Sequence, residues 1–393
     1  MKHRTDTVAH AHSFALMPEP ILAGIHKISV AAPDLSKLEE VYLLDAYRST
    51  WVSSAGPYIS RFEKAFAKLV SKTRYAVAVN SGTSALHLAL LSCDIGEGDE
   101  VIVPTFTMIA TANAVTYCGA KPIFIDADPF TWNMDVTKIE SKITKKTKAI
   151  MVVHVYGLPV DMDPVLLLAK KHGLRVIEDA AEAHGALYKG KRVGSIGDIA
   201  GFSLYANKII TTGEGGMVTT NDRALAEKVA YLRDHAFSKR THFWHNDVGF
   251  SYNMTNLQAA VGLGQTERFR ELFMKRKKLA AMYKTYLKEV RGFIFSITPP
   301  ESMHAHWVFG FRVDASTYGM TRDQVRLRLA KHGIETRGFF IPIHLQPAYA
   351  MYTTNESYPV SDMLMREGLY LPSSGILTHG EIMKIVRILS KRD

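Results

Sequence analysis

The stretch YAVAVNSGTSALHLALL, residues 75–91, passes from a strand pattern to a helix pattern across one short turn. Tyr75 to Val79 is a brief run of small and branched apolar residues, which predicts a buried strand. Ser84 to Leu91 predicts a helix, and Gly82 lies in the turn that separates the two. The stretch therefore predicts a strand–turn–helix unit of an α/β protein.

The same alternation continues after this unit. Further strands are expected at Val101 to Val103, Pro122 to Ile125, Ile150 to Val155, Arg175 to Glu178, Ile199 to Leu204 and Met217 to Thr220. Helices are expected at Ala110 to Cys118, Pro164 to Lys171 and Asp222 to Arg233. Strands that alternate with helices predict a largely parallel sheet covered on both faces, with ligands bound at the carboxyl ends of its strands.

A second unit is expected toward the C-terminus. A long helical stretch runs from Thr255 to about Val290, and a strand, a helix and a strand follow at Phe309 to Val313, Arg322 to His332 and Glu335 to Phe340. A chain of 393 residues also exceeds the size of a typical single core. We therefore expect an N-terminal extension at 1–26, a large domain at 27–262 and a small α+β domain at 263–393.

Composition is that of an ordinary globular protein, with 47% hydrophobic and 22% charged residues. The apolar runs are too short to cross a bilayer, so a cytoplasmic location is expected. Cys93 and Cys118 are read as buried, inert thiols, and no metal site is expected from them. His10 and His12 in the extension fit either a mobile terminus, which we favour, or a metal-binding tail.

The formal net charge of +10 favours anionic partners. The basic residues are mostly scattered, and no nucleic-acid-binding motif is present, so nucleic acid is the weaker interpretation. A diphosphate-bearing small molecule fits the charge at least as well.

The first candidate binding segment is Asn80-Ser81-Gly82-Thr83-Ser84-Ala85, at the strand-to-helix junction. The start of a helix presents unpaired amides, and Gly82 lets the backbone approach a phosphate closely. Thr83 and Ser84 add hydroxyl groups. Because similar Ser and Thr caps are common in helices, a purely structural cap is the alternative.

Two further segments carry ionisable groups just beyond buried strands. Asp179, in Glu178-Asp179-Ala180-Ala181-Glu182, is placed to pair with a protonated pyridine nitrogen, or else to cap a helix. Lys208 ends Ser203-Leu204-Tyr205-Ala206-Asn207-Lys208, before the glycine-rich stretch Thr211 to Gly216. A desolvated lysine there would become a neutral nucleophile able to form a Schiff base, whereas a surface lysine is the alternative.

In this order, the three segments resemble the sugar aminotransferases of the DegT/DnrJ/EryC1 family, which use pyridoxal phosphate (PLP). The resemblance runs from about Ile28 to the C-terminus. It includes further matched segments at Trp51 to Gly56, Phe62-Glu63, His154 to Gly157, Met254 to Ala260 and Pro342 to His344. It implies an aspartate-aminotransferase-like α/β fold (PLP fold type I), in which a large domain with a mostly parallel seven-stranded sheet is joined to a smaller C-terminal α+β domain.

The resemblance also implies roles for individual residues. Lys208 holds PLP as a Schiff base and shuttles a proton, and Asp179 pairs with the pyridine nitrogen. Glu182 lies near the phenolic oxygen of the cofactor. The phosphate is held by Gly82, Thr83, Ser84 and Ser203. A related PLP dehydratase has His in place of the lysine, so Lys208 favours amino transfer over dehydration.

Three positions depart from the family pattern. Met108 stands where relatives place an aromatic residue over the pyridine face, and a thioether can pack there with a smaller contact area. Ser251 replaces an Asn that reaches the phosphate from the neighbouring subunit. Asn253 replaces a basic residue near the substrate. Substrate contacts are further expected from Ser54, Tyr156, Arg337 and His344.

The implied reaction moves an amino group from L-glutamate to C4 of a nucleotide-diphosphate 4-keto-6-deoxyhexose in two ping-pong half-reactions, within a homodimer that shares its active sites. Within the same class, the alternative is a UDP- or dTDP-linked sugar, or amination at C3. From another class, the alternative is a PLP-binding regulator that does not turn over.

Overall fold

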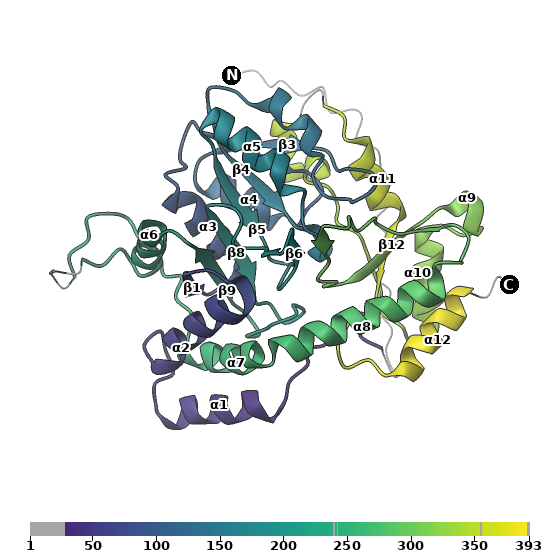
Figure 1. The fold of residues 1–393 in the computed structure, drawn as a ribbon, viewed down its shortest axis with the longest axis horizontal. Coiled ribbons are helices and arrows are strands. Elements are labelled where there is room, and N and C mark those ends of the chain that lie inside the picture. The colour runs from purple at the N-terminus through teal and green to yellow at the C-terminus, as the bar shows by residue number, and fades with distance from the viewer. Residues whose placement is uncertain (1–27, 239, 242, 354–355, 391–393) are drawn as a thin grey trace, which may run out of the picture.

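The computed structural model describes residues 28–238, 240–241, 243–353 and 356–390. The expected extension at 1–26, with His10 and His12, lies outside these residues. Figure 1 shows a large unit built around a central sheet and a smaller unit beside it, with the long helix α8 running from one toward the other. In the described part of the chain, no helix is long and apolar enough to cross a membrane.

The central sheet has seven strands in the order β1-β9-β8-β5-β4-β2-β3. The strands are β1 (Tyr75–Val79), β2 (Glu100–Pro104), β3 (Lys121–Ile125), β4 (Thr147–Val153), β5 (Arg175–Asp179), β8 (Ile199–Ser203) and β9 (Gly216–Thr220). Strand β9 is antiparallel to both β1 and β8, whereas the other neighbouring pairs are parallel. The mostly parallel seven-stranded sheet expected from the sequence is thus confirmed.

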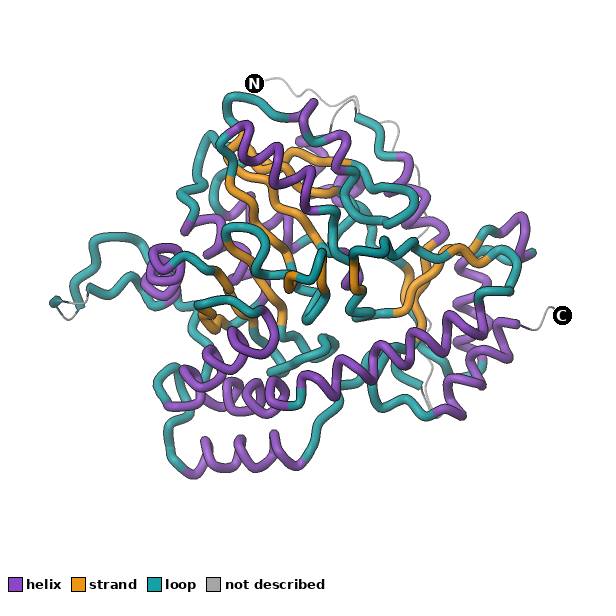
Figure 2. The backbone as a smooth tube through the Cα atoms, viewed as in Figure 1, coloured by secondary structure: helices purple, strands orange, loops and turns teal. Residues whose placement is uncertain are grey.

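Helices cover both faces of this sheet, as Figure 2 shows. On β4, Ala149 and Met151 pack into the cluster that includes α3, whereas Ile150 and Val152 pack into the cluster that includes α5. Side chains of a strand alternate between faces, so a strand with two covered faces must be apolar throughout. The covering helices include α3 (Gly82–Ser92), α4 (Ala110–Tyr117), α5 (Met162–His172), α6 (Arg223–Arg233) and α2 (Pro57–Phe66).

The smaller unit contains a four-stranded antiparallel sheet, ordered β10-β12-β14-β13. Its strands are β10 (Phe293–Ile294), β12 (Phe309–Val313), β14 (Gly368–Leu371) and β13 (Arg337–Gly338). Around it lie α8 (Phe269–Leu287), α9 (Ala315–Tyr318), α10 (Arg322–Lys331), α11 (Pro359–Glu367) and α12 (His379–Ser390). The expected strand from Glu335 to Phe340 is wrong in length, because pairing with β14 covers two residues only.

A third small sheet, β11-β6-β7, joins two strands from the large unit with one from the smaller unit's part of the chain. It consists of β6 (Leu187–Tyr188), β7 (Lys191–Arg192) and β11 (Ser302–Met303). The thiols expected to be inert are sheltered, and burial raises the pKa of Cys93 and of Cys118 to about 12.

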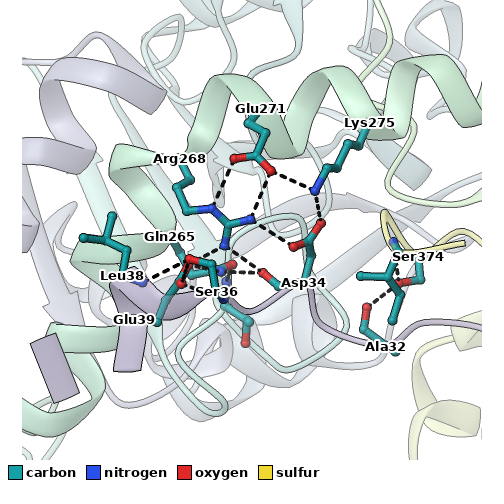
Figure 3. Close-up of polar contacts among 12 residues, drawn as sticks. Ala32, Asp34, Ser36, Leu38, Glu39, Gln265, Arg268, Glu271, Lys275 and Ser374 are labelled. Carbon is teal, nitrogen blue, oxygen red and sulfur yellow. Dashed lines mark hydrogen bonds and ion pairs between the residues drawn. The ribbon is translucent and has the colours of Figure 1, made fainter. Parts of the chain in front are cut away.

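The single long helix expected from Thr255 to Val290 is wrong, because the structure has two helices there. Helix α7 (Asn256–Glu267) ends at Arg268, whose ψ of 3° leaves the helical range, and α8 begins directly afterwards. The Arg268 guanidinium turns toward the start of α1 (Lys37–Arg48), where it contacts Asp34, before the helix, at 2.9 Å and Glu39, in the first turn, at 2.8 Å (Figure 3).

This network fixes α1 to the junction of α7 and α8. Arg268 also contacts Glu271 at 3.1 Å, and Lys275 contacts Asp34 at 2.7 Å. Burial opposes the ionisation of Glu39, but hydrogen bonds from Ser36, Gln265 and Arg268 outweigh it and hold the pKa of Glu39 below its ordinary value. The carboxylate therefore stabilises the fold when it is charged.

We predict that Arg268→Gln lowers the free energy of unfolding by roughly 2–4 kcal/mol at neutral pH, because it leaves the sheltered Glu39 carboxylate without its cation and Asp34 with Lys275 alone. Chemical denaturation measures the loss. The difference from the parent should shrink as the pH falls through the lowered pKa of Glu39 and that group protonates. Lys37→Ala, which breaks an exposed pair with Glu40, is the control and should change stability by less than about 0.5 kcal/mol. Equal losses in the two variants would contradict the role of the network.

Candidate active site

Lys208 lies in the loop that leaves the carboxyl end of β8. The loop is closed by backbone hydrogen bonds, with Leu204 donating to the Gly215 carbonyl at 2.8 Å and Thr212 donating to the Leu204 carbonyl at 2.9 Å. A Cβ at Gly215 would meet the Thr212 hydroxyl at 2.3 Å, so glycine is needed there for the chain to return to β9. The tight turn places Lys208 at the sheet edge where ligands of parallel sheets bind.

The side chain of Lys208 is buried, which excludes the surface lysine considered as the alternative. Its Nζ lies 3.8 Å from Glu182 Oε1 and 3.7 Å from the ring centroid of Trp307. Burial lowers the pKa of Lys208, although the charges of Glu182 and Asp179 oppose the shift. The amine is thereby brought closer to its neutral, nucleophilic form.

Asp179 is the last residue of β5 and is also buried. Its Oδ2 accepts a hydrogen bond from the Thr111 hydroxyl at 2.7 Å, and its Oδ1 accepts one from the Ala181 amide at 3.1 Å. Turns rather than a helix follow, so the alternative interpretation as a helix cap is wrong. Two partners leave acceptor sites on the carboxylate free for a ligand.

Glu182 connects Lys208 to the turn after β4. Its Oε2 accepts a hydrogen bond from the Tyr156 amide at 2.7 Å, and its other oxygen faces the lysine. Burial raises the pKa of Glu182. Tyr156 has a φ of 55°, in the left-handed region, and its hydroxyl accepts from the Phe340 amide at 3.2 Å. The strand expected to reach Val155 ends at Val153, because the chain turns here to present the Tyr156 amide to Glu182.

The start of α3 provides an anion site beside Ser203. Ser81 caps the helix by accepting from the Ser84 amide at 3.0 Å, which leaves the amides of Gly82 and Thr83 as the first of the helix without intrahelical acceptors. A Cβ at Gly82 would lie 2.8 Å from the Ser203 Cβ, so the helix start and β8 meet because residue 82 is glycine. The hydroxyl of Ser84 is bonded within the turn, to Ser81 and Asn80.

A cavity of about 400 Å³ opens at this helix start. Its walls are formed by Asn80, Ser81, Thr83, Ser84, His87, Tyr117, Glu214 and Tyr252. Ser251 lies close by, since its carbonyl accepts from the Asn80 side chain at 3.4 Å, and its own side chain is exposed. Asn253 donates to Asp234 at 2.7 Å.

Met108 precedes α4, three residues before Thr111, and is 50% exposed. Its sulfur accepts from the Ala110 amide at 3.0 Å, which fixes the thioether in the turn that leads to the Asp179 partner. Its exposure leaves it accessible to a ligand.

Besides Asn253, four residues were expected to contact substrate, and they have different surroundings. Tyr156 is enclosed, whereas Ser54 is exposed in a loop that the Asn256 side chain holds through the Trp51 carbonyl at 2.7 Å. Arg337 is half exposed, and its nearest carboxylate, Glu335, lies 3.7 Å away. It is therefore available to an anion.

His344, in contrast, is held inside the protein. Its Nδ1 lies 2.8 Å from the Thr105 hydroxyl, its Nε2 lies 2.9 Å from Asp362, and its ring stacks on Tyr358. A substrate contact through either nitrogen would have to displace one of these partners. The geometry favours a structural role.

Sequence reasoning missed Thr111 and Trp307. Thr111 lies three residues after Met108. This position could have indicated that its hydroxyl is a hydrogen-bond donor to a carboxylate of the site. Nothing in the sequence near Trp307 linked it to Lys208, which is about a hundred residues away along the chain.

The arrangement fits the demands of PLP. A buried amine, a carboxylate with free acceptor sites and an anion-binding helix start are brought to one edge of the sheet by β8, β5 and α3. The close approach of the α3 start to β8, which Gly82 allows, suits a bound phosphate, and the remaining acceptor sites of Asp179 suit a protonated ring nitrogen. Each group corresponds to one part of the cofactor: the aldehyde, the ring nitrogen and the phosphate.

Comparison with known proteins agrees with this assignment. The chain is 46% identical to GDP-perosamine synthase of Caulobacter vibrioides over 374 residues, which cover 94% of this chain and 99% of that protein. It is 42% identical to GDP-perosamine synthase of Escherichia coli O157:H7, covering 93% and 98% of the two chains.

Solved structures show the same fold. DesV of S. venezuelae superposes with a TM-score of 0.85 at 33% identity, covering 93% of this chain and all of that one. The PLP-form of the Streptococcus pneumoniae sugar aminotransferase Spr1654 superposes with a TM-score of 0.86 at 27% identity, covering 93% and 98%. The expected aspartate-aminotransferase-like fold is confirmed.

The model of the DegT/DnrJ/EryC1/StrS aminotransferase family matches residues 33–390, nearly the whole chain. This protein belongs to that family and is a PLP-dependent sugar aminotransferase.

Proposed function

We propose that the protein transfers an amino group from L-glutamate to C4 of a GDP-linked 4-keto-6-deoxyhexose. The burial of the Lys208 amine beside Glu182 and near Asp179 is the observation that carries the amino-transfer chemistry. The choice of sugar is supported by the names of the two relatives at 46% and 42% identity. The basic net charge suits a diphosphate substrate.

Bound PLP supplies an electron-withdrawing ring that stores nitrogen and electrons between the two half-reactions. Lys208 would hold the cofactor through its aldehyde, and its free amine would carry the proton in each half-reaction. Asp179 would hold a proton at the ring nitrogen, with its carboxylate oriented by Thr111 and the Ala181 amide. The amides of Gly82 and Thr83, with the Ser203 hydroxyl, would bind the phosphate.

Arg337 is proposed to bind the diphosphate, because it is half exposed and a guanidinium can contact two phosphate oxygens at once. It lies two residues before Phe339, whose ring packs 4.8 Å from that of Tyr156. This contact connects the arginine to the enclosed part of the site.

A homodimer is proposed as the working assembly. The segment between α6 and α7 extends away from the large unit (Figure 1), and it exposes Phe243 by 74%, Trp244 by 60% and Val248 by 87%. Large apolar side chains on an extended segment favour burial against a second copy. Ser251, at the base of this segment, is proposed to reach the phosphate of that copy.

We predict that Lys208→Ala loses amino-transfer turnover by several orders of magnitude, because no amine is left to displace or to carry the proton. Borohydride reduction of the parent followed by peptide mapping should label residue 208. Lys208→Arg, which keeps the charge but not the nucleophile, is the control and should be equally inactive. Labelling at another lysine would refute the assignment.

The substrate is tested by offering GDP-, UDP- and dTDP-linked 4-keto-6-deoxyhexoses with L-glutamate and identifying the amino sugar by mass and NMR. The proposal expects the GDP sugar to give the highest kcat/KM, with amination at C4. A higher kcat/KM for the UDP- or dTDP-linked sugar, or amination at C3, would contradict the proposed substrate and favour that alternative. If glutamate left the visible absorbance of the bound cofactor unchanged, the regulator without turnover would be favoured.

For Arg337→Ala, we expect KM for the nucleotide sugar to rise by about tenfold or more, with little change in KM for glutamate, because a charged hydrogen-bonded contact to the diphosphate is lost. Steady-state kinetics measures both constants. Arg366→Ala, which removes an exposed arginine on α11, is the matched control. An unchanged KM in the Arg337 variant would exclude the contact.

A further inference from the structure

We propose that Trp307 is a positioning residue, which holds the ammonium of Lys208 against its indole face whenever that amine is not bonded to the cofactor. The inference rests on the proposed function of Lys208. Trp307 lies between β11 and β12, outside the central sheet, so the contact joins Lys208 to a chain segment from the smaller unit.

The geometry is that of a close cation–π contact. Lys208 Nζ lies 3.7 Å from the centroid of the Trp307 ring, well inside the range of about 6 Å over which such contacts act. Trp307 is only 4% exposed, so water does not weaken the attraction. Among aromatic side chains, an indole attracts cations most strongly.

The indole is fixed relative to the lysine backbone. Its Nε1 donates to the carbonyl of Asn207, the residue directly before Lys208, at 2.8 Å. The backbone of Trp307 is held in turn, since its carbonyl accepts from Arg276 at 3.2 Å. The ring therefore moves with the loop that carries the amine, and it does not depend on the side-chain rotamers of the site.

The contact with Trp307 stabilises the Lys208 ammonium at a position where Glu182 does not form a hydrogen bond with it. Glu182 Oε1 is 3.8 Å from Lys208 Nζ, longer than a hydrogen bond, and its other oxygen already accepts from the Tyr156 amide. A buried ammonium without close acceptors is costly. The ring face offsets part of that cost without forming a directional bond, so the amine can leave this position and return to the cofactor in each catalytic cycle.

The experiment varies the electron density of the ring at nearly constant volume. The full-length protein, loaded with pyridoxamine phosphate so that the Lys208 amine is free, is prepared with tryptophan carrying no, one, two or three fluorine atoms. The rate of acylation of Lys208 is followed against pH by mass spectrometry of its peptide. Fluorination weakens the attraction for a cation, so we expect the titration midpoint of Lys208 to fall by about 0.5 to 1.5 pH units across the series.

The chain contains four tryptophans, so the contribution of Trp307 must be isolated. In Trp307→Phe, fluorination should no longer move the midpoint. In Trp132→Phe, which alters another buried tryptophan of the same cluster, the full shift should remain. A midpoint that does not change across the series, or a shift that persists in Trp307→Phe, would overturn the proposal.

The result is separable from the test of the proposed function. If borohydride labels another lysine while fluorination still moves the midpoint of Lys208, the contact is real and the catalytic assignment of Lys208 fails. If borohydride labels Lys208 and the midpoint is constant, the assignment stands and the positioning role of Trp307 is wrong.

Discussion

Burying the ammonium of Lys208 removes its hydration, which costs free energy. The neighbouring groups of the active site offset part of that free energy. An unpaired buried cation would lose its proton or open the structure to water. Here Lys208 Nζ lies 3.8 Å from Glu182 and 3.7 Å from the centroid of the Trp307 ring, and the charge of Asp179 also acts on it. The compensation is incomplete, so the pKa of the lysine stays lowered. That partial compensation is what a reusable nucleophile requires.

The parallel sheet is what makes this arrangement possible. The carboxyl ends of parallel strands meet at one edge, so Asp179 after β5 and Lys208 after β8 become neighbours although they are far apart in the chain. The start of α3 reaches the same edge because Gly82 packs on Ser203. The sheet alone does not enclose the site, however. Trp307, Phe339 and other groups from outside it close the site with an aromatic cluster around Tyr156.

Local patterns in the sequence were sufficient for the large unit and for the charged groups of the site. The middle of each strand in the central sheet is mostly apolar because both faces of the sheet are covered, and this pattern is visible without knowledge of the fold. The break at Arg268 was not visible, because its cause is a pair of carboxylates, Asp34 and Glu39, more than 200 residues earlier. The short pairing of Arg337 with β14 and the contact of Trp307 with Lys208 likewise depend on chain segments that meet only in the folded protein.

Glu178 and Asp179 are adjacent carboxylates that accept different numbers of hydrogen bonds. This difference distinguishes a structural carboxylate from one that can bind a ligand. Glu178 and Asp179 are both buried at the end of β5, and their side chains point to opposite faces of the strand. Glu178 accepts hydrogen bonds from His154 and from the amides of Gly194, Ile196 and Gly197, and these bonds outweigh burial and hold its pKa below the ordinary value.

Asp179 accepts only two hydrogen bonds from the described residues, and burial raises its pKa. A carboxylate has about four acceptor sites, so the four hydrogen bonds to Glu178 saturate it, whereas Asp179 has about two acceptor sites left for a ligand. A protonated ring nitrogen would supply a donor together with a positive charge. That positive charge would lower the pKa of Asp179, so the free energy lost by burying this carboxylate in the free site would be partly recovered when the cofactor binds.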